Sequence, residues 1–135
     1  MTRSQNVANI RAVVRFDTMT VPLGCVMATA TLRLNVSSQT AARTLQVYRA
    51  GSSWAEATVT WNTQPSMAGT ATTATSAVGW VPIDVTAHVT TQLAGTNDGF
   101  VVKDSVENAG TQTDVNMSPR EGANPPQLVL TFAAS

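Results

Sequence analysis

The residues that could carry nucleophilic catalysis are few in this chain. His88 is the only histidine and Cys25 the only cysteine among 135 residues, and the motif G-x-S-x-G is absent. A serine or cysteine nucleophile needs a histidine that a third group orients. His88 lies in a segment with helical spacing, and Cys25 lies in the apolar run VPLGCVMATATL. We therefore expect a surface or helix-face histidine, a buried cysteine that packs as a small hydrophobic residue, and no catalytic residue.

The carboxylates fit structural roles better than acid–base catalysis, which in glycoside hydrolysis needs two carboxylates flanking one bond. Glu56 completes the capping-box pattern Ser53-x-x-Glu56, and Asp84 comes two residues before Thr86, where a helix is expected to start. No cofactor is expected and no metal site is assigned. A structural calcium ion is the alternative, because four acids cluster in sequence, although no D-x-D-x-D-G loop is present: Asp98, Asp104, Glu107 and Asp114.

Aromatic rings and arginine forks offer the chemistry of sugar binding. Trp80 alternates with the apolar residues of GWVPIDV, so its ring is expected on the half-exposed face of a strand. Trp61 shares a face with Val59 and is expected in the core, and Trp54 is expected at a structured corner. An arginine on a strand could bind the carboxylate of an acidic sugar in a bidentate manner. The candidate ligand-binding residues are Trp80, Arg33, Arg49 and Tyr48.

Lys103 is the only lysine of the chain and lies in the expected strand 100–104. Phe100 and Val102 alternate away from it, so we expect its side chain to point to solvent. A lysine–asparagine isopeptide crosslink at Lys103 is the alternative, and loss of one ammonia from the intact mass would reveal it.

Composition excludes several classes of partner. Charged residues make up 12% of the chain and the formal net charge is zero. A nucleic-acid-binding surface needs clustered basic residues, and a membrane span needs about 20 apolar residues in a row. Neither pattern is present, so we expect no nucleic acid and no membrane insertion. The length suits one domain, 1–135.

Hydrophobic alternation predicts an all-β fold with one short helix. The helix is expected over 86–94, with Thr86 as N-cap and Gly95 after its end. The segment 65–77 is expected to be a loop with at most one short strand. Short strands separated by turn signals predict an antiparallel β-sandwich or jelly roll. The expected strands are 10–16, 28–36, 44–50, 79–85, 100–104, 113–117 and 127–132.

Several motifs together resemble a known family. They include WAEATVTWNTQP (54–65), GWVPIDVT (79–86), NDGF (97–100) and REGANPPQL (120–128). The chain resembles the DNRLRE domains, also called disaggregatase-related repeats, some of which are grouped with carbohydrate-binding modules found beside alginate lyases. The resemblance implies a jelly-roll sandwich in secreted or cell-surface proteins. The chain departs from the family pattern at two places. Pro119 is an inserted proline, and at the N-terminus the family's first strand is expected to be absent.

The resemblance and the composition lead to one expected function and one alternative. The expected function is a non-catalytic extracellular module that binds a polysaccharide weakly, an acidic one in particular, or serves adhesion. The alternative is a structural or assembly module, either completed by a β-strand from another chain or locked by the Lys103 crosslink.

Overall fold

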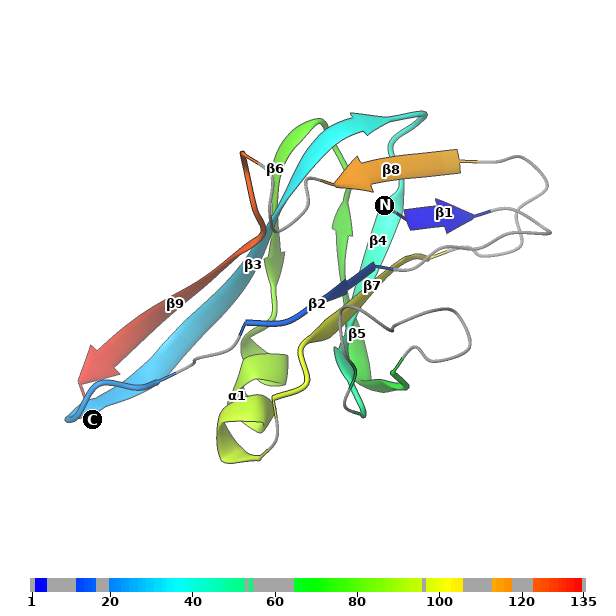
Figure 1. The fold of residues 1–135 in the computed structure, drawn as a ribbon. Helices are drawn as coiled ribbons and strands as arrows, with labels where there is room; N and C mark the ends of the chain where they lie inside the picture. The colour runs from blue at the N-terminus through cyan, green and yellow to red at the C-terminus, as the bar shows by residue number, and fades with distance from the viewer. Residues whose placement is uncertain are drawn as a thin grey trace.

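The computed structural model describes residues 2–4, 12–16, 20–52, 54, 65–95, 97–105, 113–117 and 123–134. These residues form two antiparallel β-sheets and one helix, which confirms the expected all-β sandwich (Figure 1). The elements are β1 (Thr2–Ser4), β2 (Ala12–Val14), β3 (Cys25–Gln39), β4 (Thr44–Ala50), β5 (Met67–Thr75), β6 (Gly79–Asp84), α1 (Thr86–Ala94), β7 (Phe100–Asp104), β8 (Thr113–Met117) and β9 (Gln127–Ala134).

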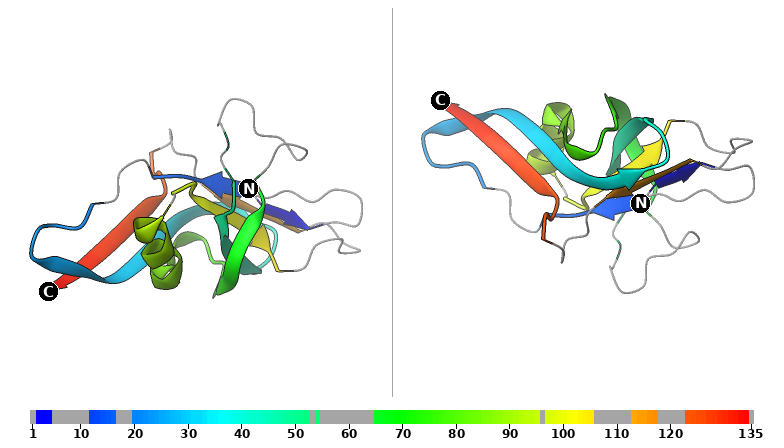
Figure 2. Two further views of the ribbon diagram at one scale, coloured as in Figure 1. Left: turned by 90° about the horizontal axis from the view of Figure 1, so that it is seen from below. Right: turned by 90° about the horizontal axis from the view of Figure 1, so that it is seen from above.

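The long strand β3 organises the five-stranded sheet. It pairs with β6 along one edge, and along the other edge with β9 and then β8, which in turn pairs with β1. The four-stranded sheet has the order β2-β7-β4-β5. β9 and the first half of β3 run side by side away from the other strands (Figures 1 and 2). This pair of strands therefore projects from the two packed sheets.

The core lies between the two sheets, as the alternation predicts. In β3 the side chains of Leu32, Leu34 and Val36 are at most 1% exposed, and the residues between them are only half-buried. Leu45 and Val47 face them from β4 as part of the same buried cluster. β-branched and leucine side chains at every second position bury one face of each of these strands against the opposite sheet.

Several segments differ from the prediction, and the largest differences are at β5 and β3. The expected loop 65–77 contains a nine-residue strand, β5. β3 (Cys25–Gln39) extends past both ends of the expected strand 28–36. β5 is built mainly from alanine and threonine, and its large hydrophobic residues are too few to give an alternating signal. Its pairing with β4 determines the strand, in the register Thr44↔Thr75 to Ala50↔Met67.

The helix α1 begins and ends as expected, but its capping differs. The N-cap residue is Val85 and makes no side-chain capping bond. The Thr86 hydroxyl instead accepts a hydrogen bond from the backbone N–H of Ala30 at 3.0 Å. Asp84 braces the helix start, because its Oδ1 accepts hydrogen bonds from the N–H and the hydroxyl of Thr86. Gly95 follows the helix with φ of −146°, outside the left-handed region.

Within the described ranges, α1 is nine residues long, and no helix there has the length and apolar character to cross a membrane.

Candidate functional site

Three side chains form a row across the outer face of the five-stranded sheet. Arg33 on β3 lies directly opposite Gln127 on β9, and Trp80 belongs to β6 on the other side of β3. The guanidinium carbon of Arg33 lies 4.6 Å from the centroid of the Trp80 ring. Arg33 Nη1 donates a hydrogen bond of 2.6 Å to Gln127 Oε1. The structure thus brings together two of the predicted ligand-binding residues, Arg33 and Trp80.

Strand register explains why Arg33 meets Trp80. Pro82 is the β6 residue opposite Arg33, and Trp80 is opposite Asn35, so the arginine leans two residues along the sheet to reach the ring. A guanidinium over an indole ring is attracted by the negative face of the ring, which contributes about 0.5–1 kcal/mol at an exposed site. The ring therefore acts as a support that holds Arg33 on the surface.

The Arg33 guanidinium keeps most of its hydrogen-bonding capacity. It carries five N–H donors in a planar fork, and within the described part of the chain the Gln127 oxygen is its one hydrogen-bond acceptor. Both Arg33 and Trp80 are half-buried, and Gln127 is exposed. Such a fork matches the two oxygens of a carboxylate.

Asp84 places a negative charge further along the same face of β6. It is exposed, and the hydrogen bonds from the hydroxyl and the N–H of Thr86 lower the pKa of its carboxyl. Asp84 lies opposite Thr31. This residue pair is two positions along the strands from the pair Arg33 and Pro82, so both pairs lie on the same face of the sheet. An anionic group on this face is therefore attracted to Arg33 and repelled by Asp84.

The other two predicted ligand-binding residues lie elsewhere. Tyr48 is on β4 of the four-stranded sheet, opposite Val101 and on the face away from the core. The Nη1 atom of Arg49 lies 3.5 Å from Nδ1 of His88 on the helix α1. A Cβ atom added to Gly69 would stand 2.6 Å from the same Nη1 atom, so the Arg49 guanidinium lies against the backbone of β5. The four predicted residues therefore belong to three places, and one of these holds Arg33 and Trp80.

Of the expected surface or helix-face histidine, only the surface position is wrong, because His88 lies on the core-facing side of α1 and is 2% exposed. Its Nε2 lies 3.1 Å from the carbonyl oxygen of Val47. A carbonyl only accepts, so Nε2 carries the proton and Nδ1 is the acceptor that faces Arg49. Burial lowers the pKa of His88, and the nearby charge of Arg49 lowers it further against the opposing effect of the Val47 hydrogen bond. This neutral ring fastens α1 to β4.

The helical periodicity contains the signal that places His88 inside. The buried residues of α1 are His88, Val89 and Gln92, which share one face at spacings of one, three and four residues. His88 therefore belongs to the core-facing stripe with Val89.

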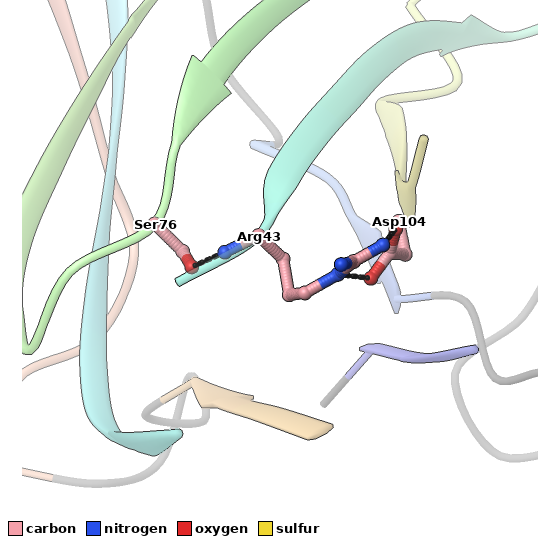
Figure 3. Close-up of polar contacts among 3 residues, drawn as sticks. All are labelled: Arg43, Ser76 and Asp104. Atoms are coloured by element: carbon pink, nitrogen blue, oxygen red, sulfur yellow. Dashed lines mark hydrogen bonds and ion pairs between the residues drawn. The ribbon is translucent and has the colours of Figure 1, made fainter. Parts of the chain in front are cut away.

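Asp104 does not remain available for the alternative calcium site. It is 1% exposed, and both carboxylate oxygens accept hydrogen bonds from Arg43, at 2.8 Å from Nε and 3.1 Å from Nη2 (Figure 3). The hydrogen bond to Asp104 raises the pKa of Arg43. Ser76 also holds this arginine, because its hydroxyl accepts from the backbone N–H of Arg43 at 2.8 Å. Among the residues that the structure describes, no group of three histidine, cysteine or acidic side chains could hold a metal ion.

Lys103 lies on the predicted face of β7, but its expected exposure to solvent is wrong. Its face is opposite to that of Phe100 and Val102, which are in the core cluster, and yet Lys103 is only 9% exposed. Its Nζ lies 3.3 Å from Gln46 Oε1 on β4, in the directly paired position. The crosslink at Lys103 stays a prediction.

Trp54 occupies a structured corner, as expected. Its Nε1 donates a hydrogen bond of 2.6 Å to the carbonyl oxygen of Asp98. The guanidinium carbon of Arg15 lies 5.0 Å from the ring centroid, and Arg15 Nη1 donates to the Trp54 carbonyl oxygen. Cys25, expected to be buried, is only half-buried at the start of β3. The expectations for Trp61, Glu56, Glu107, Pro119 and the segment 120–122 fall outside the described residues.

Comparison with models of protein families gives a match over nearly the whole chain. None of the curated proteins matches the chain. The model of carbohydrate-binding module family 96 matches residues 2–132, which include β1 to β8 and most of β9. This match confirms the expected carbohydrate-binding module, while the narrower DNRLRE resemblance stays a prediction. Because the match extends over almost the whole sequence, the chain belongs to carbohydrate-binding module family 96.

Proposed function

We propose that this module binds an acidic polysaccharide weakly on the outer face of the five-stranded sheet, without catalysing a reaction. The observation that carries the proposal is the Arg33 guanidinium held over the Trp80 ring, 4.6 Å from its centroid. The module would serve adhesion or glycan association within a secreted or cell-surface protein, where carbohydrate-binding modules commonly act.

The geometry favours an acidic ligand over a neutral one. A neutral sugar ring would need an exposed aromatic face to stack on, but the Arg33 guanidinium covers one face of Trp80. The ligand therefore meets the arginine, whose fork matches a carboxylate. The binding is weak because a single cation on an open sheet face is well solvated and screened by salt.

The positions of His88 and of the carboxylate of Asp104 support a non-catalytic role. Both ring nitrogens of His88 are directed at Val47 and Arg49, inside the protein. Asp104 is paired with Arg43. Neither side chain reaches the outer face that carries Arg33, so neither could act on a ligand bound there.

Gel retardation on a polyuronate such as alginate tests the proposal. Arg33→Ala and Trp80→Ala should each lose most of the retardation of the wild-type protein. Tyr48→Ala is the matched control, because it removes an aromatic side chain from the outer side of the other sheet. Retardation that survives both Arg33→Ala and Trp80→Ala, or that only Tyr48→Ala abolishes, would overturn the assignment to this face.

A second candidate is the structural module completed by a strand from another chain, and the projecting strands β3 and β9 support it. Pairing of β3 with β6 begins at Thr31, so in the described structure no strand covers the β6-side edge of residues 25–29. An uncovered edge is a template for strand addition. Exposed apolar residues gather on these strands and the segment before them: Val21, Leu23, Val26, Val129 and Phe132.

Light scattering after size-exclusion chromatography tests this second candidate. Val26→Lys places a charge in the uncovered segment and should abolish any assembly that the wild-type chain forms, alone or with a partner strand. The second candidate is excluded if the wild-type protein is a monomer, binds no added β-strand peptide, and keeps its melting temperature when the peptide is present.

A further inference from the structure

Gln127 is the third member of the row on the five-stranded sheet, and the sequence analysis did not identify it as a candidate. It is the first residue of β9 and lies directly opposite Arg33. Its side chain is exposed, and its Oε1 lies 2.6 Å from Arg33 Nη1. The contact joins neighbouring strands, where opposite side chains are close enough to fix one another.

The chemistry of the pair determines which way the Gln127 amide points. Arginine only donates hydrogen bonds, so the amide oxygen must face Arg33 and the amide NH₂ must face away. Among the described residues, none accepts a hydrogen bond from this NH₂ group. Gln127 therefore presents two further N–H donors beside the guanidinium.

We propose that Gln127 is a specificity-determining residue that makes the row select anionic sugars. This inference rests on the proposed function of Arg33 and Trp80. Gln127 holds the guanidinium over Trp80 through its oxygen, which leaves the far edge of the fork open. Its NH₂ group then donates to the same carboxylate that the fork binds.

The neutrality of Gln127 is essential to this role. A glutamate at this position would also accept from Arg33, but its two oxygens would bind the fork in a bidentate manner and cancel the charge. The guanidinium would then be saturated within the protein, and a carboxylate of the ligand would meet a second negative charge. An amide orients the arginine and leaves its charge available.

The substitution Gln127→Glu tests the inference, with Gln127→Leu as the companion variant. Affinity for an acidic polymer should fall roughly tenfold or more in Gln127→Glu, and roughly threefold in Gln127→Leu, which keeps the charge of Arg33 but loses its acceptor. Thr73→Glu is the matched control, since Thr73 is an exposed residue of β5 on the other sheet. It adds the same charge and should bind like the wild type. Thermal unfolding should show that all three variants are folded.

The ionic-strength dependence of binding separates selectivity from a merely structural role. Wild-type binding should weaken with added salt, and the residual binding of Gln127→Glu should be nearly independent of salt. If Gln127→Glu binds like the wild type while Arg33→Ala fails to bind, the role of Gln127 is overturned and the proposed function stands. An equal loss in Thr73→Glu also overturns the role of Gln127, because it would show a long-range charge effect. If Arg33→Ala and Trp80→Ala both bind normally, the proposed function itself fails.

Discussion

The side chain of His88 donates a hydrogen bond from Nε2 to the carbonyl oxygen of Val47, across 3.1 Å between α1 and β4. The other ring nitrogen faces Arg49 Nη1 at 3.5 Å. A protonated ring at this position would place a second positive charge against the guanidinium, inside the protein. The contact between helix and sheet therefore depends on a neutral imidazole.

Acid should destabilise the protein through His88. Burial lowers the pKa of His88 below its ordinary value of 6.5, so between the folded pKa and 6.5 the unfolded chain binds more protons than the folded chain. The stability that neutral His88 contributes should be fully present above pH 6.5 and should be lost as the pH falls through the folded pKa. Urea unfolding at about pH 7.5 and about pH 5.5 measures this difference.

His88→Gln supplies the comparison for that measurement. It cannot titrate, so the loss of stability between the two pH values should be smaller than in the wild type. An identical loss in both proteins would contradict the role of His88. Independently of pH, His88→Ala should destabilise the fold by about 2–4 kcal/mol, because it leaves a cavity and the Val47 carbonyl without its donor.

Removing Arg43 alone should destabilise the protein strongly, because it leaves the buried carboxylate of Asp104 without its partner. Arg43→Ala removes the bidentate partner of a carboxylate that is 1% exposed, and should cost about 3–5 kcal/mol of unfolding free energy. Replacing both residues together, Arg43→Leu with Asp104→Leu, should cost less than the sum of the single replacements, because no buried charge remains. Additive costs in a double-mutant cycle would show that the two residues stabilise the fold separately.

Two glycines with positive φ should respond differently to alanine. Gly99 has φ of +88°, and an added Cβ would clash with the carbonyl oxygen of Val14 and stand 2.9 Å from the Cα of Arg15. Because both are backbone atoms, Gly99→Ala should cost more than about 2 kcal/mol. Gly24 has φ of +80° with nothing within 4 Å of the added Cβ, so Gly24→Ala should cost only about 1–2 kcal/mol. Equal melting temperatures for the two variants would contradict this difference.

The fold was predictable from the sequence where large side chains alternate. Leu32, Leu34 and Val36 define the buried face of β3, and Val81 and Ile83 define that of β6, all as expected. β5 escaped prediction because alanine and threonine give no contrast between faces, so its strand depends on pairing with β4. The hydrogen bond of the Thr86 hydroxyl was not predicted either, because its partner, Ala30, is far away in sequence.

The candidate site was predictable only in part. Strand parity is enough to place Arg33 and Trp80 on an outer face, but it says nothing about which strands are neighbours. The antiparallel register of β3 with β6 and β9 brings Trp80, Arg33 and Gln127 into one row. The alternation of side chains along the strand also gave the wrong exposure for Lys103, which lies on the expected face but is only 9% exposed. Burial of an outer face depends on what covers it, which local alternation does not encode.

Arg33→Lys should weaken binding although it keeps the charge. A lysine ammonium lacks the planar fork that binds a carboxylate through two hydrogen bonds, and it stacks less well on Trp80. Affinity for an acidic polymer should fall by about three- to tenfold. The remaining binding should still decrease with salt from about 0.05 M to about 0.5 M, whereas that of Arg33→Ala should depend little on salt. Affinity electrophoresis at both salt concentrations measures the two effects together. An Arg33→Lys variant as tight as the wild type would show that charge alone is recognised and that the guanidinium geometry over Trp80 plays no part.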